Sequence, residues 1–77
     1  MINARAKMIN VEKEINDFLD KNPKVTSVNF PFKEYKSLHE KIIETHIEIA
    51  TKESDINIEE GNKWFRDQVR KLTDFIP

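Results

Sequence analysis

One short segment of the sequence alternates strictly between two faces, and it ends at a proline: Val25-Thr26-Ser27-Val28-Asn29-Phe30-Pro31. In an extended chain, successive side chains point to opposite sides, so residues 25–30 have the pattern of a half-buried β-strand. A single strand leaves its backbone donors and acceptors unpaired. Because the sequence contains no second convincing strand, we expect this segment to pair with the same strand of a second copy. The product would be an intertwined homodimer with a two-stranded ribbon, a shape that fits the major groove of DNA.

Elsewhere the apolar residues recur every three or four positions, which is typical of amphipathic helices. This spacing predicts three helices, at residues 8–20, 31–51 and 57–73. Pro31 suits a first helical turn, where its missing N–H costs nothing. Asn57 followed by Glu60 predicts an N-cap with a reciprocal glutamate, and Gly61 permits close packing. The expected fold is therefore one mostly α-helical domain over residues 1–77, with one short strand.

Length and charge restrict what this domain can do. With 77 residues, a single core is marginal and oligomerisation commonly supplies the missing stability. The net charge of −1 creates no general attraction to nucleic acid, so DNA binding would need a local basic patch. Residues 1–7 show no stable pattern and are expected to fray, and Met8 is an alternative start. No apolar run approaches the length of a membrane span and no signal peptide is evident, so we expect a cytoplasmic protein without membrane contact.

The order of strand, proline-started helix, polar junction and capped helix resembles the ribbon-helix-helix family of dimeric DNA-binding proteins. The matching positions lie within about residues 24–73 and comprise residues 25–31, Tyr35, Leu38, Ile42, residues 56–58, Phe65, Val69 and Leu72. The predicted helix at residues 8–20 would be an addition to that fold. The resemblance implies a homodimer that binds a double-stranded DNA operator and regulates transcription. It also implies base-facing side chains on the outer side of the ribbon, which are Val25, Ser27 and Asn29.

Phosphate contacts are expected at two places. The resemblance implies that the start of the last helix, at Asn57 and Ile58, holds a DNA phosphate through its backbone. Lys24 and Lys33 flank the ribbon at its two ends, where cationic side chains would contact phosphates. Asn29 could form two hydrogen bonds with the edge of an adenine. The alternative for the ribbon residues is that they simply cover the solvent side of a strand.

The sequence offers little for catalysis. Its single glycine excludes a glycine-rich phosphate loop. His39 and His46 are seven residues apart on one predicted helix, about 10 Å along its axis, so they cannot share one metal ion. His46 interrupts an apolar stripe and is interpreted as a packing residue. We therefore expect no enzymatic activity, no metal and no cofactor.

A second hypothesis uses the same residues without DNA. The chain could be a non-catalytic all-α protein-binding module, such as a phage-type inhibitor or scaffold protein, in which residues 24–30 are an extended linker. The apolar stripe of residues 32–50 is broader than a coiled-coil seam, as expected for a helix that touches more than one neighbour. Trp64 and Phe65 are adjacent and cannot share one narrow face, so one of them should contact a different layer. The partner in this hypothesis is a protein.

Overall fold

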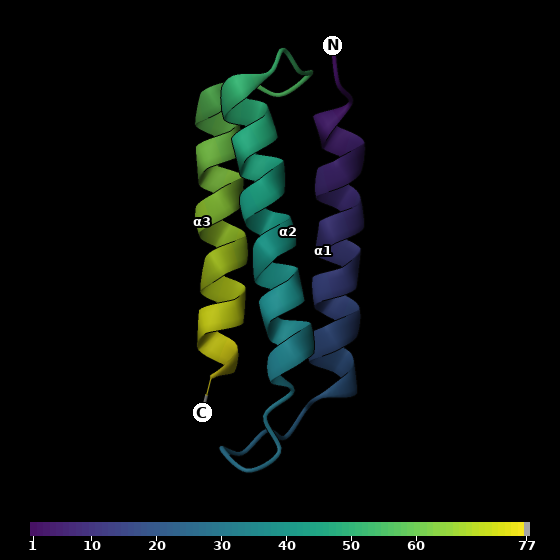
Figure 1. Ribbon diagram of the computed structural model, residues 1–77, viewed down its shortest axis with the longest axis vertical. Helices are drawn as coiled ribbons and strands as arrows, with labels where there is room; N and C mark the ends of the chain where they lie inside the picture. Colours follow the sequence, from purple (N-terminus) through teal and green to yellow (C-terminus); the bar gives the residue numbers. More distant parts are fainter. Residues whose placement is uncertain (77) are drawn as a thin grey trace.

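The computed structural model describes residues 1–76, which form an up-down-up bundle of α-helices (Figure 1). The helices are α1 (Ala4–Lys21), α2 (Phe32–Thr51) and α3 (Ile58–Phe75). The bundle is elongated, with dimensions of 42 × 17 × 16 Å. Within residues 1–76, no helix combines the length and the apolar composition that a membrane span requires.

The core follows the helical spacing of the apolar residues. Each helix contributes one completely buried large side chain, namely Ile15, Ile42 and Leu72. Trp64 is also buried, and its indole Nε1 donates a hydrogen bond to Glu12 Oε1 of α1 at 2.8 Å. Phe65 is only half-buried and lies on the α2 side of α3. The prediction that these adjacent aromatic residues contact different layers is therefore confirmed.

The packing is not symmetric around the bundle. α2 packs extensively against both of its neighbours, whereas α1 and α3 touch over a shorter stretch. A groove of about 240 Å³ remains between α1 and α3. Gln68 lines this groove, and its buried Oε1 has no hydrogen-bond partner among residues 1–76. The α1–α3 seam is thus the least complete of the contacts between helices.

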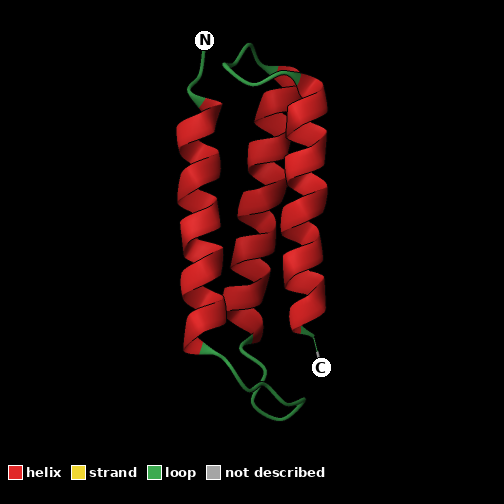
Figure 2. Ribbon diagram, turned by 180° about the vertical axis from the view of Figure 1, so that it is seen from behind, coloured by secondary structure: helices red, strands yellow, loops and turns green. Residues whose placement is uncertain are grey.

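The prediction of a largely helical chain is confirmed, but the predicted strand is wrong. Residues 1–76 contain no β-strand, only an isolated bridge between Ile2 and Ser54, and residues 22–31 form an irregular loop (Figure 2). A ribbon-helix-helix fold requires a strand at residues 25–30, so that fold class does not apply. The intertwined dimer predicted from this strand loses the element that was to join its two copies.

Local hydrogen bonds explain why the alternating segment is not extended. The Asn29 side-chain oxygen accepts from the backbone N–H of Thr26 at 2.6 Å and from its hydroxyl at 2.9 Å. Short polar side chains offer the backbone such alternatives to a strand ladder. The contact closes a turn and leaves Val28 at its tip, 95% exposed. Thr26, Val28 and Phe30 consequently do not share one buried face.

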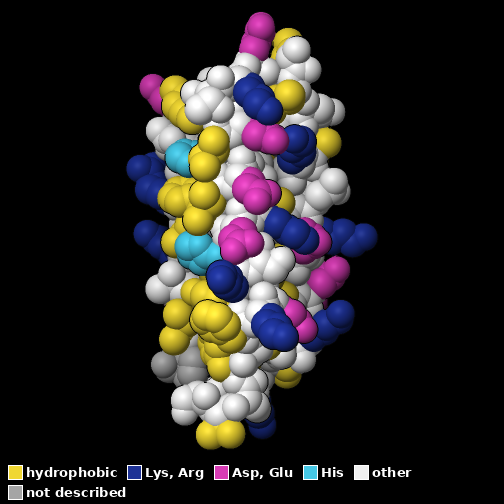
Figure 3. All heavy atoms as spheres, in the orientation of Figure 1, with side chains coloured by type: hydrophobic (Ala, Val, Ile, Leu, Met, Phe, Trp, Pro, Cys, Tyr) yellow, Lys and Arg dark blue, Asp and Glu magenta, His cyan; other side chains and the backbone are white. Residues whose placement is uncertain are grey.

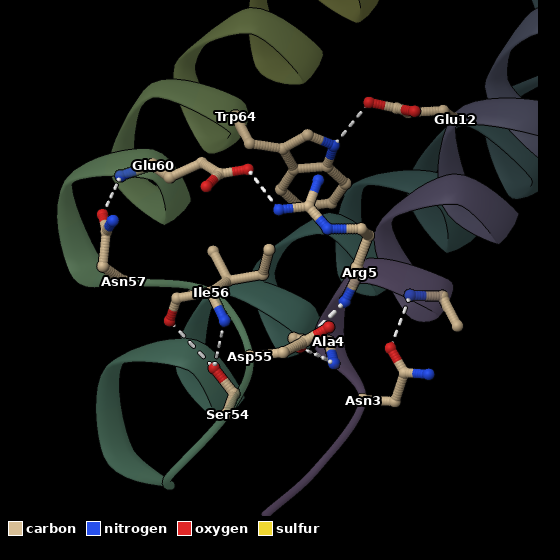
Figure 4. A network of polar contacts seen from close by, with 11 residues as sticks. Asn3, Ala4, Arg5, Glu12, Ser54, Asp55, Ile56, Asn57, Glu60 and Trp64 are labelled. Atoms are coloured by element: carbon tan, nitrogen blue, oxygen red, sulfur yellow. Dashed lines mark hydrogen bonds and ion pairs between the residues drawn. The ribbon is translucent and has the colours of Figure 1, made fainter.

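The first helix begins earlier than predicted, at Ala4 rather than Met8. The Asn3 side chain accepts a hydrogen bond from the N–H of Ala6 at 3.1 Å. Asp55, in the loop between α2 and α3, accepts from the N–H groups of Ala4 at 2.7 Å and Arg5 at 3.2 Å (Figure 4). Ala4 is fully buried. The first turn of α1 is therefore held by the α2–α3 loop, and the expectation that residues 1–7 fray is wrong.

Replacing Asp55 with alanine should lower the free energy of unfolding by about 1–2 kcal/mol, as for the loss of an N-cap. The expected cause is that two amide groups at the start of α1 lose their acceptor. Asp55→Asn is the matched control, because it keeps an acceptor oxygen and should cost less. Urea unfolding followed by circular dichroism measures both values. Equal stability of Asp55→Ala and the original protein would contradict the role of Asp55 as a cap.

The other two helix starts agree only partly with the sequence analysis. Pro31 is the N-cap residue of α2, and its carbonyl accepts from Tyr35 N–H at 3.0 Å. Asn57 caps α3 as predicted, with its side-chain oxygen 2.8 Å from Glu60 N. The predicted reciprocal bond is absent from the hydrogen bonds of residues 1–76. Glu60 instead pairs with Arg5 of α1, at 3.2 Å, because the start of α1 lies beside it (Figure 4).

Candidate functional site

Large apolar side chains remain exposed along one side of α2 and α3. On α2 they are Phe32, Ile43 and Ile47, which are 63%, 39% and 52% exposed. On α3 the exposed member is Ile58, and the exposed Ile76 follows directly after the helix. The half-buried Phe65 and Val69 lie between them. Figure 3 shows hydrophobic side chains and both histidines in one column along the bundle. We call this surface the α2–α3 face.

The helical rotation explains how this face arises. Successive residues of a helix are turned by about 100°. Ile43 follows the buried Ile42, and Phe65 follows the buried Trp64, so each points sideways out of the core. Val69 follows the buried Gln68 in the same way. The α2–α3 face is thus a second apolar stripe beside the one that builds the core.

At its centre, the seam between α2 and α3 is closed by a histidine. The ring of His46 stacks on the ring of Phe65, with centroids 4.5 Å apart and an interplanar angle of 26°. His46 Nε2 lies 2.8 Å from Asn62 Oδ1. The packing role predicted for His46 is therefore confirmed. Because this pair fills the seam, the face is continuous from one helix to the other.

At the end of the bundle that carries the loop of residues 22–31, the face continues into an open hollow of about 570 Å³. It is lined by Ser27, Phe30, Phe32, Tyr35 and Ile76. Phe30 holds the loop against the helices, with ring centroids 5.2 Å from Tyr35 and 5.8 Å from Phe75. The loop of residues 22–31 therefore extends the apolar surface beyond the start of α2.

Charged side chains of opposite sign border the face. Glu44 follows Ile43 on α2, and Arg66 and Arg70 follow Phe65 and Val69 on α3, each turned about 100° further from the core. Glu40 lies one turn from Glu44 on the same side. The middle of the border on α2 is thus acidic and the middle of the border on α3 is basic. Lys36, one turn before Glu40, and Asp74, one turn after Arg70, reverse these signs near the loop of residues 22–31. In Figure 3, acidic side chains border the upper and middle parts of the apolar column on one side, with Lys or Arg below them, and Lys or Arg side chains lie on the other side.

Among residues 1–76, these border charges form no ion pair. The ion pairs among residues 1–76 are Arg5–Glu60, Lys7–Glu48 and Lys41–Glu14, and each of them joins α1 to another helix. The hydrogen bond from Lys7 lowers the pKa of Glu48. The seams next to α1 are therefore covered by ion pairs. The outer seam between α2 and α3 is covered by apolar side chains, with unpaired charges on both borders.

The residues proposed to contact DNA are divided between the two ends of the bundle. Lys24, Val25, Ser27 and Asn29 lie in the loop of residues 22–31, and Lys33 lies in the adjoining first turn of α2. Asn57 and Ile58 lie at the start of α3, beyond the other end of α2. The 20 residues of α2 separate the two groups by about 30 Å. Within one chain, the structure does not bring them together as one surface.

The exposed residues of the face were not identified as a site from the sequence. The sequence did contain an indication of this face, because the apolar stripe of residues 32–50 is wider than a stripe that only faces the core. Within residues 1–76, no group of three or more His, Asp or Glu side chains is placed to hold a metal ion. Comparisons of the chain with protein-family models, with curated proteins and with solved structures found no match.

Proposed function

We propose that this chain is a non-catalytic helical module that binds protein through its α2–α3 face. The observation that carries the proposal is the continuous row of exposed apolar side chains over α2 and α3. Monomeric proteins seldom expose large continuous apolar patches, and those that do commonly use them to bind partners. Fully burying one such side chain contributes about 1.5–3 kcal/mol, so a few of them supply substantial affinity.

The layout of the face supports a protein partner in particular. An apolar centre with a charged rim is the usual anatomy of a protein–protein interface. The face also spans most of the length of two helices, which suits a large partner better than a small ligand. For DNA, the carboxylates of the α2 border would oppose the phosphates. The hypothesis of DNA binding by a ribbon required a strand at residues 25–30, which is absent from residues 1–76.

A photo-crosslinking residue at position 47 tests the proposal in cells that make the protein. The expected result is a covalent adduct of defined mass that disappears when Ile43→Lys is added, because the lysine places a charge in the middle of the face. The matched control position is Ile9, which is 56% exposed but lies on α1. Absence of an adduct at position 47, or the same adducts at position 9, would show that the face binds no protein.

A further inference from the structure

We propose that the α2–α3 face binds a second copy of this chain, with the two-fold axis of the dimer parallel to the helices. This inference rests on the proposed function of the face in binding protein. It deepens that proposal by naming the partner and the orientation. The arrangement of the unpaired border charges carries the argument.

Two directions of a two-fold axis place the face against itself with the helices of both copies aligned. A two-fold interface uses the same patch on both copies. If the axis lies across the helices, the α2 border of one copy meets the α2 border of the other, so Glu40 and Glu44 are kept away from Arg66 and Arg70. If the axis runs along the helices, the α2 border of each copy meets the α3 border of the other. Only the second arrangement places Glu40 and Glu44 against Arg66 and Arg70.

The positions of the charges along the bundle axis agree with the arrangement in which the two-fold axis is parallel to the helices. Gly61 lies directly against Ile49, so these residues are level on the antiparallel helices α3 and α2. Glu44 lies five residues before Ile49, and Arg66 lies five residues after Gly61. Because both helices rise by the same distance per residue, Glu44 and Arg66 are level. By the same reasoning, Glu40 is level with Arg70.

Rotation about an axis parallel to the helices leaves the position of every residue along that axis unchanged. Glu44 of one copy therefore meets Arg66 of the second copy, and Glu40 meets Arg70. Each contact occurs twice because of the symmetry. Exposed ion pairs contribute little affinity but strongly disfavour the wrong orientation, in which like charges meet. The charges select the arrangement, and the apolar centre supplies the attraction.

The centre of this dimer is apolar. At the middle height, Ile43 and Ile47 of each copy face Phe65 and Val69 of the other. α2 of one copy lies over α3 of the second, and these helices run in opposite directions, so their dipoles are favourably opposed. The four helices form a bundle with α1 of each copy on the outside. The half-buried ring of Phe65 would become fully enclosed.

The available area reaches the lower limit for a specific dimer. A helix of 20 residues is about 30 Å long, and two packed helices are about 17 Å wide, so the footprint is roughly 500 Å² on each copy. The total of roughly 1,000 Å² reaches the size expected of a specific interface. The hollow next to Phe32 and Ile76 adds further apolar surface at one end.

Charge reversal of one border at a time tests the geometry. The first variant carries Glu40→Lys and Glu44→Lys, and the second carries Arg66→Glu and Arg70→Glu. Each variant alone should dimerise at least about tenfold more weakly, because both of its borders then have the same sign. An equimolar mixture should form a heterodimer, because every border contact again joins opposite charges. Native mass spectrometry and sedimentation equilibrium measure these populations. All four positions are exposed, and circular dichroism establishes that each variant is folded.

Ile47→Lys and Ile9→Lys provide the matched apolar controls. The first should produce a monomer and the second should leave the dimer unchanged, because Ile9 lies on α1, outside the face. The proposal is overturned if the purified chain is monomeric up to near-millimolar concentration, or if the mixture of reversed variants forms no heterodimer. A monomeric chain that still gives the Ile43-dependent adduct in cells would reject self-association alone. A monomer without that adduct would reject both proposals.

Discussion

Replacing Trp64 with alanine is expected to lower the free energy of unfolding by about 3–5 kcal/mol. The side chain is 6% exposed and is the largest in the core, so its removal leaves a cavity that rigid helices cannot close. It also deprives Glu12 of the hydrogen bond from the indole, at 2.8 Å. Stability is typically about 0.05–0.15 kcal/mol per residue, so this loss would take much of the total for so small a domain. Urea unfolding followed by circular dichroism gives the difference.

Two variants separate the causes of that loss. Trp64→Phe retains most of the ring but removes the N–H donor, so it should cost less than the alanine substitution. Phe65→Ala removes an aromatic residue of the same helix that is only half-buried, and it should cost less than Trp64→Ala. If Trp64→Ala unfolds at the same urea concentration as the original protein, Trp64 is not a core residue.

Gly61→Ala is expected to destabilise the protein by about 1–3 kcal/mol, the usual cost of overpacking. Inside a helix the same change normally stabilises by about 0.5–1 kcal/mol, so the expected sign is reversed. A Cβ at position 61 would lie 2.7 Å from Cγ2 of Ile49 and 3.5 Å from its Cβ. Isoleucine is branched at Cβ and has few alternative rotamers within a helix, so it cannot turn away. The helices α2 and α3 would have to move apart.

A double-mutant cycle identifies this cause. Ile49→Ala removes the methyl group that the new Cβ would meet. In that background, Gly61→Ala should be neutral or stabilising, which gives a favourable coupling energy between the two positions. Thermal unfolding of the four proteins provides the values. A more stable Gly61→Ala single variant would show that the close approach of α2 and α3 is easily relaxed.

The helices were predictable because their signals are local. Asn57 caps the third helix through the backbone of Glu60, only three residues away. The apolar spacing of Met8, Val11 and Ile15 likewise needs no knowledge of the rest of the chain. The first turn of α1 was missed because its cap is not local. The acceptor for Ala4 is Asp55, 51 residues further along the sequence.

The prediction of a strand was wrong because an alternating pattern of only six residues is weak evidence for a strand. Thr26 and Asn29 would lie on opposite sides of a strand, whereas in the folded chain they bond to each other. The exposed face was missed for a different reason. Residues such as Ile42 and Ile43 are equally apolar in the sequence. Which of them is buried depends on where α1 and α3 dock, and this is determined by contacts between distant segments.

The uneven packing around α1 also affects how the molecule opens. α1 packs mainly against α2, its ion pairs lie at the surface, and its seam with α3 contains the unpaired oxygen of Gln68. Cooperative units with few buried contacts open at a lower free energy than the whole domain. α1 is therefore the unit that should detach first, leaving α2 and α3 as a helical hairpin held by the close approach of Gly61 and Ile49. Amide hydrogens of α1 would then exchange with solvent through partial opening, while those of the hairpin would exchange only through global unfolding.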